Sequence, residues 1–284
     1  MPEVKAAPFV EWRLAGASKG VALTTTAAFT TFPIGTNYLK LKPRNFSTAV
    51  VARYALNPYL VVLKTTDALG TVAAFTDASE NMQDGSTATT LSMNSFDTAA
   101  NGDFVYVGSP LPFRGVRVTI GNTNSVGAST LTVKYWQDAA TDAWTTITAT
   151  DGTASGGDTF GVTGNVTWTV PTDWLKKSLM EISDYLVLQG STAEIAMARN
   201  LASQIFYVPL FWTRWETSAA FDSTVTATEM QAMNRSTTYD ELLENEIQEQ
   251  VVHRGVSGVG CVEALTDAGT ANLLVSVAST GGFG

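Results

Sequence analysis

Side chains with catalytic potential are scarce in this sequence. It contains one histidine, His253, and one cysteine, Cys261, so any Ser-His-Asp or Cys-His arrangement must use His253. Ser18 lies in a GxSxG pattern, residues 16–20 (GASKG), but a nucleophile elbow needs a strand before it and a helix after it. Residues 21–32 are rich in threonine and predict a strand instead. We therefore interpret residues 16–20 as a turn and expect no catalytic residue and no enzymatic activity, with a hydrolase as the minor alternative.

Ligands for a metal or a cofactor are equally sparse. One histidine and one cysteine are too few for a common zinc site within the chain, and no GxxxxGK[ST] phosphate loop is present. Aspartates in adjacent turns offer the oxygen ligands that calcium prefers, namely Asp138, Asp142, Asp151 and Asp158. Their spacing is not that of an EF-hand, and aspartate is a frequent turn residue. We expect no metal and no cofactor, with calcium as the alternative.

Seven tryptophans are the other chemically distinctive residues. Most of them lie in or beside expected strands, where they either pack in a core or subunit interface or form a platform on which a sugar ring stacks. Core or interface packing is the simpler interpretation. Sugar binding stays open as the alternative.

The charge balance restricts the partners. The chain of 284 residues carries 17 basic and 26 acidic residues, a net charge of −9. Binding to nucleic acid or to an anionic membrane requires a basic surface, so we expect neither. The N-terminal residues lack the pattern of a signal peptide, and no apolar run has the length of a membrane span, so we expect folding in a cytoplasm.

The elements that position these residues are short strands. Residues 102–174 contain alternating apolar and polar segments separated by turn residues, at 104–107, 116–120, 131–136, 144–148 and 166–170. Short period-2 runs at this spacing are typical of an antiparallel sandwich or jelly roll. We therefore predict a mainly β protein, an antiparallel β-sandwich of jelly-roll type.

The same region resembles a known family. The run STLTVKYWQDAATDAWTTITATDGTASGGDTFGVTGNVTWTVPTDW resembles a cassette in structural proteins of tailed-bacteriophage particles, and the runs GDFVYVGSPLPFRGVRVTIG and FWTRWETSAAFDSTVTATEM are similar to the same family. The resemblance covers roughly residues 45–230. It implies a non-enzymatic structural subunit of a virion, a head-decoration or a tail, baseplate or fibre component, assembled in the bacterial host cytoplasm with copies of itself and other virion proteins. The alternative is a carbohydrate-binding module that recognises a host glycan.

Two segments depart from this train of strands. Residues 175–204 interrupt the family pattern as an insertion, with a short helix expected at 193–202. Residues 205–216 (IFYVPLFWTRWE) form the densest aromatic run. Because Pro209 cannot donate a ladder hydrogen bond, we expect this strand either to lie at a sheet edge or to contain a bulge.

Residues 238–254 predict one C-terminal α-helix. Thr238 and Glu241 fit a capping box, and Gly255 fits the position after the helix. Tyr239, Leu243, Ile247 and Val251 recur every four residues as an apolar stripe. The helix dipole then explains His253 in the last turn.

The two chain ends are expected to contact neighbouring subunits. We divide the chain into an N-terminal arm (1–20), a β-sandwich domain (21–235), and a C-terminal helix with a short hairpin and tail (236–284). Short isolated strands are marginal in water, so both ends need a sheet to join, in a neighbour or in their own domain. The interface residues expected on this basis are Phe9, Trp12, Phe211, Trp215, Leu273 and Val275.

Overall fold

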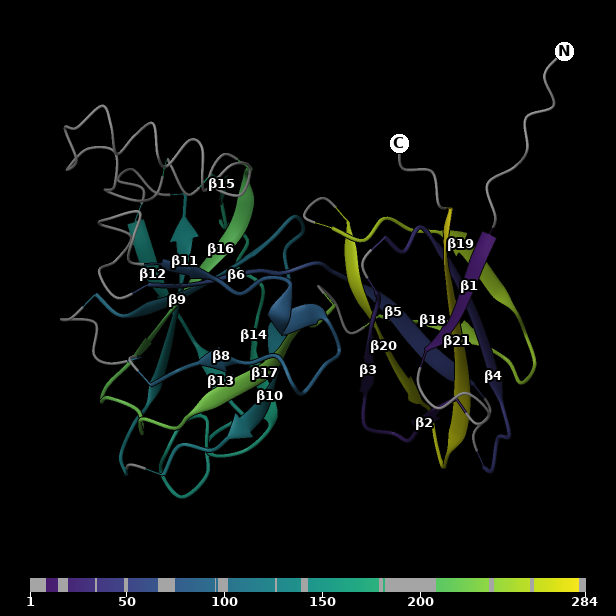
Figure 1. Ribbon diagram of the computed structural model, residues 1–284, viewed down its shortest axis with the longest axis horizontal. Helices are drawn as coiled ribbons and strands as arrows, with labels where there is room; N and C mark the ends of the chain where they lie inside the picture. The colour runs from purple at the N-terminus through teal and green to yellow at the C-terminus, as the bar shows by residue number, and fades with distance from the viewer. Residues whose placement is uncertain are drawn as a thin grey trace, which may run out of the picture. The chain divides into compact units, whose positions relative to one another are not determined.

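The computed structural model describes residues 9–14, 20–33, 35–48, 51–65, 75–94, 96, 102–125, 127–138, 143–178, 181, 208–234, 238–255 and 258–280. The chain divides into two compact units (Figure 1). The terminal unit comprises Met1–Asn57 and Thr237–Gly284, and the central unit comprises Pro58–Ser236. The expected N-terminal arm and the expected C-terminal segment thus belong largely to one unit, because strands from the two ends of the chain pair with each other.

The terminal unit contains two antiparallel sheets. Sheet A has the order β1 (Phe9–Leu14), β21 (Ala271–Thr280), β4 (Tyr38–Arg44) and β19 (Gln248–Val251), and β2 (Val21–Leu23) also pairs with β21. Sheet B has the order β18 (Asp240–Leu242), β5 (Ala52–Pro58), β20 (Val259–Thr266) and β3 (Ala28–Thr31). Leucines and valines at alternate positions of β4 and β21 share one buried cluster with residues of β5, β18 and β20. The two sheets therefore pack on a common core.

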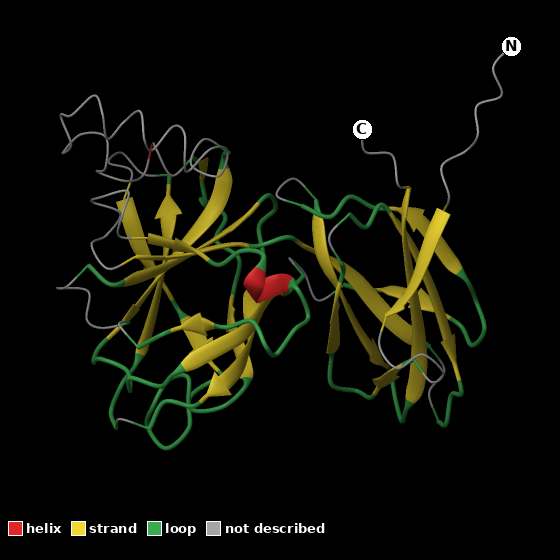
Figure 2. Ribbon diagram, viewed as in Figure 1, coloured by secondary structure: helices red, strands yellow, loops and turns green. Residues whose placement is uncertain are grey.

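The central unit repeats this plan with larger sheets. Sheet C has the order β12 (Ala143–Ile147), β11 (Leu131–Gln137), β16 (Leu210–Thr217), β9 (Phe104–Ser109), β6 (Val61–Thr65) and β7 (Phe75–Asp77), and β15 (Lys176–Lys177) also pairs with β16. Sheet D has the order β13 (Ala149–Asp151), β14 (Gly164–Trp168), β10 (Gly115–Asn122), β17 (Thr226–Ala232) and β8 (Leu91–Ser92). A 3-10 helix, η2 (Asn81–Gln83), lies between β7 and β8 in the chain (Figure 2).

The prediction of a mainly β, antiparallel protein is confirmed. In the central unit, Val133 and Trp215 of sheet C belong to the same buried cluster as Val118 and Val166 of sheet D. Such a cluster, fed by alternate residues of two sheets, is what the inner faces of a β-sandwich form. The expected strands at 104–107, 116–120 and 131–136 correspond closely to β9, β10 and β11.

The predicted C-terminal helix is wrong. Residues 238–255 contain the strands β18 and β19, which pair with β5 and β4 respectively. Between them Asn245 adopts a positive φ of 66°, and the amide of Glu246 donates to the carbonyl of Leu243 at 3.0 Å, closing a turn. The apolar stripe is not buried: Leu243, Ile247 and Val251 are exposed, whereas Leu242 and Val252 are buried. Pairing with two sheets therefore overrides the local helical pattern, and His253 does not lie at a helix end.

The edge position expected for the aromatic strand is also wrong. β16 lies between β11 and β9 and pairs with both. Pro209 precedes the first residue of β16, so its missing amide hydrogen costs the ladder nothing. The short helix expected at 193–202 lies outside the described residues.

The described part of the N-terminal arm joins its own chain. β1 pairs with β21 from Phe9 opposite Thr280 to Leu14 opposite Val275. β20 and β21 likewise pair with β3 and β4 of the same unit. The need of short strands for a sheet is thus met within the chain, which is the alternative in which these segments join their own domain.

Candidate functional site

One face of sheet C in the central unit carries a cluster of charged and aromatic side chains. Lys134 of β11 lies directly opposite Arg214 of β16, and Arg214 lies opposite Tyr106 of β9 on its other side. Their chain neighbours Val133 and Trp215 are in the core. Because successive side chains of a strand point to opposite faces, Lys134, Arg214 and Tyr106 lie on the face of sheet C away from the core.

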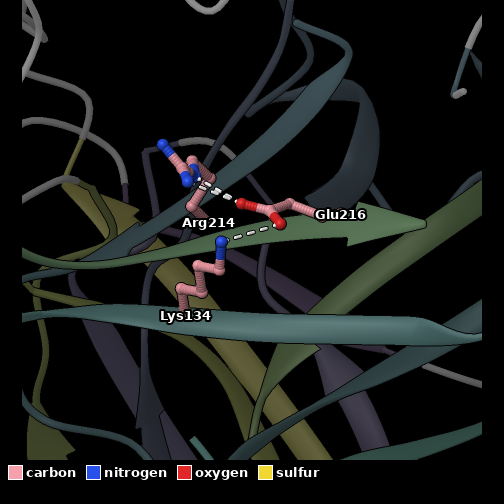
Figure 3. Close-up of polar contacts among 3 residues, drawn as sticks. All are labelled: Lys134, Arg214 and Glu216. Carbon is pink, nitrogen blue, oxygen red and sulfur yellow. Dashed lines mark hydrogen bonds and ion pairs between the residues drawn. The ribbon is translucent and has the colours of Figure 1, made fainter. Parts of the chain in front are cut away.

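Ion pairs link β11 and β16 (Figure 3). Glu216 Oε1 accepts hydrogen bonds from Arg214 Nε at 2.9 Å and Nη2 at 2.6 Å, while Glu216 Oε2 lies 2.9 Å from Lys134 Nζ. The Glu216 side chain is 8% exposed, compared with 17% for Arg214. One nearly buried carboxylate therefore holds two cations, and charge-assisted bonds of this kind are stronger than neutral ones.

Aromatic rings enclose the guanidinium. Arg214 Cζ lies 4.3 Å from the ring centroid of Phe104 and 5.1 Å from that of Trp144. The Trp144 ring in turn contacts Tyr106, with centroids 5.7 Å apart, and Trp136, with centroids 5.3 Å apart. We call Phe104, Tyr106, Lys134, Trp136, Trp144, Arg214 and Glu216 the Arg214 cluster. Cation–π contacts of this type fix the side chain further.

The Arg214 cluster is suited to holding strands together rather than to proton transfer. Both oxygens of its carboxylate are engaged by cations. The sequence indicated only part of it. Alternation within residues 131–136 and 210–215 places Lys134 and Arg214 away from the core, but nothing in the sequence pairs two strands so far apart.

A second polar network closes the end of sheet C. Asp173 accepts hydrogen bonds from Gln137 Nε2 at 2.6 Å and from the Tyr135 hydroxyl at 3.0 Å. The bond from Gln137, assisted by that from Tyr135, lowers the pKa of the Asp173 carboxyl below its ordinary value. Burial, followed by the bond to Asp173, raises the pKa of Tyr135. These groups secure the segment after β14 against β11.

A pocket of about 600 Å³ opens at the edge of the central unit. We call it the threonine pocket. It is lined by Arg114, Ile147, Thr148, Thr150, Thr167, Trp168 and Thr169. It lies where the chain crosses from β12 of sheet C into β13 of sheet D, at residue 148.

Strand pairing brings the lining of the threonine pocket together. Thr150 of β13 lies directly opposite Thr167 of β14. The backbone amide of Trp168 donates to the carbonyl of Arg114 at 2.8 Å, and the indole Nε1 of Trp168 donates to the carbonyl of Phe113 at 2.9 Å. The residues before β10 are thereby fixed beside β14.

Those residues considered for catalysis and metal binding that the structure describes do not come together. Ser18 and Asp142 lie outside the described residues, Cys261 is buried, and His253 is exposed. Asp151 Oδ1 accepts bonds from the Thr153 amide at 2.8 Å and hydroxyl at 2.6 Å, which is a turn contact. In the described parts of the chain, His, Cys, Asp and Glu form no group of three able to hold a metal.

The residues expected at an interface lie mostly within the chain's own folds. Trp215 is 0% exposed in the core of the central unit, and Leu273 and Val275 are each 1% exposed in the core of the terminal unit. Phe211 is half-buried against the central core. Phe9 and Trp12 lie in β1, opposite Thr280 and Val277. Trp215, Leu273 and Val275 therefore contribute to cores rather than to a surface that a partner can reach.

The tryptophans follow the simpler interpretation where they are described. Trp168, Trp174, Trp212 and Trp215 are buried, and Trp136 and Trp144 are half-buried within the Arg214 cluster. No described helix has both the length and the apolar character needed to cross a membrane. Comparison of the chain with protein-family models, with curated proteins and with solved structures gives no match.

Proposed function

We propose that this chain is a non-enzymatic structural subunit of a bacteriophage particle, in the head decoration or in the tail, that acts by assembling with copies of itself and with other virion proteins. The particle context is supported by the sequence resemblance centred on residues 102–174. The assembly role is supported by a surface of the terminal unit. The jelly-roll form of its sandwiches stays a prediction.

The observation that carries the assembly role is the outer edge of β19. This strand ends sheet A, and in the described part of the chain β4 is its strand partner. Val251 is 86% exposed and Ile247 49% exposed. Soluble proteins usually protect a sheet edge with charges, prolines or bulges. Here Glu249 is the charged residue of the strand, and it is paired with Lys40 at 3.0 Å.

An accessible sheet edge with exposed apolar side chains such as Val251 is a surface on which another strand can add. We propose that β19 pairs with β19 of a second copy, related by a twofold axis, because an antiparallel pair of identical strands is self-complementary. Val251 and Ile247 would then leave water together with the strand edge. The low content of charged residues, 15%, is consistent with surfaces that assembly buries.

Sedimentation of the purified chain tests this proposal. We expect an oligomer at tens of micromolar, and we expect Val251→Lys to shift it toward the monomer. Leu111→Lys is the matched control, because Leu111 is an exposed apolar residue, at 59%, in the central unit. A wild-type chain that stays monomeric and binds no other virion protein would falsify the proposal.

A carbohydrate-binding module remains the second candidate. Trp168, Trp174, Trp212 and Trp215 are too buried to form a stacking platform, so the aromatic version of that proposal loses support. The threonine pocket is the observation that favours sugar binding.

A further inference from the structure

We propose that the threonine pocket binds a monosaccharide-sized sugar that carries a carboxylate. This inference goes beyond the assembly role and does not depend on it, because the pocket lies within the central unit whereas β19 belongs to the terminal unit. It gives the second candidate function a location and a ligand class.

The first argument is the charge of the lining. Among the described residues that line the pocket, Arg114 is the ionisable one, and none of them carries a carboxylate. The chain as a whole carries a net charge of −9. A concave surface whose described lining carries a guanidinium and no acid differs from the acidic average of the chain, and it favours a ligand with a negative charge. Guanidinium and carboxylate also match in geometry.

The second argument is the set of hydroxyls. Thr148, Thr150 and Thr169 are exposed and Thr167 is half-buried. Within the described part of the chain, the side-chain hydroxyls of these threonines bond to no protein group. Each hydroxyl is one donor and two acceptor sites. Such a surface matches a ligand that itself presents several hydroxyls.

The third argument is size and apolar contact. Small-molecule pockets occupy roughly 300–1,000 Å³, and this pocket has a volume of about 600 Å³. Ile147 and Trp168 line the pocket beside the four threonines, whose methyl groups are apolar. Sugar rings expose C–H groups that pack on such surfaces, whereas a free phosphate ion does not use them.

Phosphate sites are usually built differently. They rely on backbone amides at a helix N-terminus or in a glycine-rich loop, or on several cations. The described lining of the threonine pocket carries one cation and belongs to strands and the segments beside them. The lining therefore favours one carboxylate attached to a polyol over a compact inorganic anion.

Calorimetric titration of the full chain with glucuronic acid, glucose and inorganic phosphate tests the inference. We expect saturable binding of glucuronic acid, weaker binding of glucose, and poor competition by phosphate. Arg114→Gln should lower the affinity for glucuronic acid by at least about tenfold, the equivalent of one charged hydrogen bond. It should leave the affinity for glucose nearly unchanged. Thr150→Val keeps the side-chain shape and should weaken both sugars.

Thr146→Val is the matched control, because Thr146 is an exposed threonine of β12 that does not line the pocket. It should bind like the wild type. If Arg114→Gln lowers the melting temperature, its effect on binding cannot be separated from its effect on folding. The binding of the two sugars by Thr150→Val then tests the inference. Absence of saturable binding, equal affinity for the two sugars, competition by phosphate as strong as by glucuronic acid, or unchanged binding by Thr150→Val would each overturn the inference. The assembly role is tested separately, because sedimentation measures the oligomeric state and not sugar binding.

Discussion

The carboxylate of Glu216 holds the guanidinium of Arg214 by two hydrogen bonds, from Nε at 2.9 Å and from Nη2 at 2.6 Å, on the same strand. The opposite oxygen of Glu216 reaches Lys134 on the neighbouring strand at 2.9 Å. Arg214 and Glu216 are two residues apart in the chain, so both side chains point to the same face of β16. This relationship ties β11 and β16 together outside the core and makes Glu216 the centre of the Arg214 cluster.

Replacing Glu216 by Gln should destabilise the central unit. The change leaves two cations without their anion in a largely buried place, and we expect a loss of about 2–3 kcal/mol in the free energy of unfolding. Urea denaturation followed by circular dichroism measures it. Glu241→Gln is the control, because its ion pair with Arg53 is exposed, at 53% and 42%, and should be worth less than about 1 kcal/mol. Equal effects of the two variants would contradict the role given to Glu216.

Trp215→Ala and Trp144→Ala should differ in their effects on stability. Trp215 is 0% exposed, and truncation of a buried tryptophan typically costs about 3–5 kcal/mol. Trp144 is half-buried and loses mainly its contacts to Arg214, Tyr106 and Trp136, about 1–2 kcal/mol. Thermal unfolding distinguishes them. If Trp215→Ala melted like the wild type but no longer self-associated, Trp215 would belong to an interface after all.

Local patterns in the sequence predict the strands of the central unit well. The alternation of residues 116–120 and 131–136 reflects one buried and one outward face, and β10 and β11 have that arrangement. The segment 59–63 is continuously apolar, a pattern typical of a fully buried strand, and all five of its residues are buried. Whether a segment forms a strand depends largely on its own residues, so the strands could be predicted from the sequence.

Which strands pair with each other across long stretches of chain could not be predicted from the sequence. Lys40 of β4 lies opposite Ser276 of β21. Nothing in the sequence of either segment indicates that the two strands pair. The same limit explains the failed helix. The spacing of Leu243, Ile247 and Val251 fits a helix, but the edges of sheets A and B offer backbone partners that a local pattern does not reveal. The Arg214 cluster and the threonine pocket arise from such pairings, so neither was predicted.

Asp173 should make stability depend on pH in the acid range. Its hydrogen bonds from Gln137 and Tyr135 lower its pKa in the folded state. The resulting stabilisation is complete above the unfolded-state pKa, about 3.9, and is lost as the pH falls through the folded-state value. The difference in unfolding free energy between the wild type and Asp173→Asn should therefore be constant near neutral pH and shrink below about pH 4. A difference that did not change in acid would show that these bonds do not favour the ionised carboxylate.

Deletion of residues 1–14 should expose one edge of β21. β2 covers that edge opposite Ala271–Leu273, and β1 covers it from Val275 to Thr280, while β4 pairs along the other edge. Without β1, the backbone amides of β21 that donate to it lose their acceptors, and six residue pairs of the ladder disappear. At about 0.5–1.5 kcal/mol for each hydrogen bond, we expect the terminal unit to lose at least about 2 kcal/mol.

Amide hydrogen exchange measures this loss strand by strand. Protection should fall in the stretch of β21 that faces β1 and persist where β2 still pairs, opposite Ala271–Leu273. Deleting residues 1–8 is the matched control, because it leaves β1 complete. The shortened chain should also self-associate more strongly than the control, since an uncovered strand edge invites pairing with another chain. If exchange in β21 were the same in both chains, β1 would not contribute to the stability of sheet A, and an arm that acts outside its own chain would regain support.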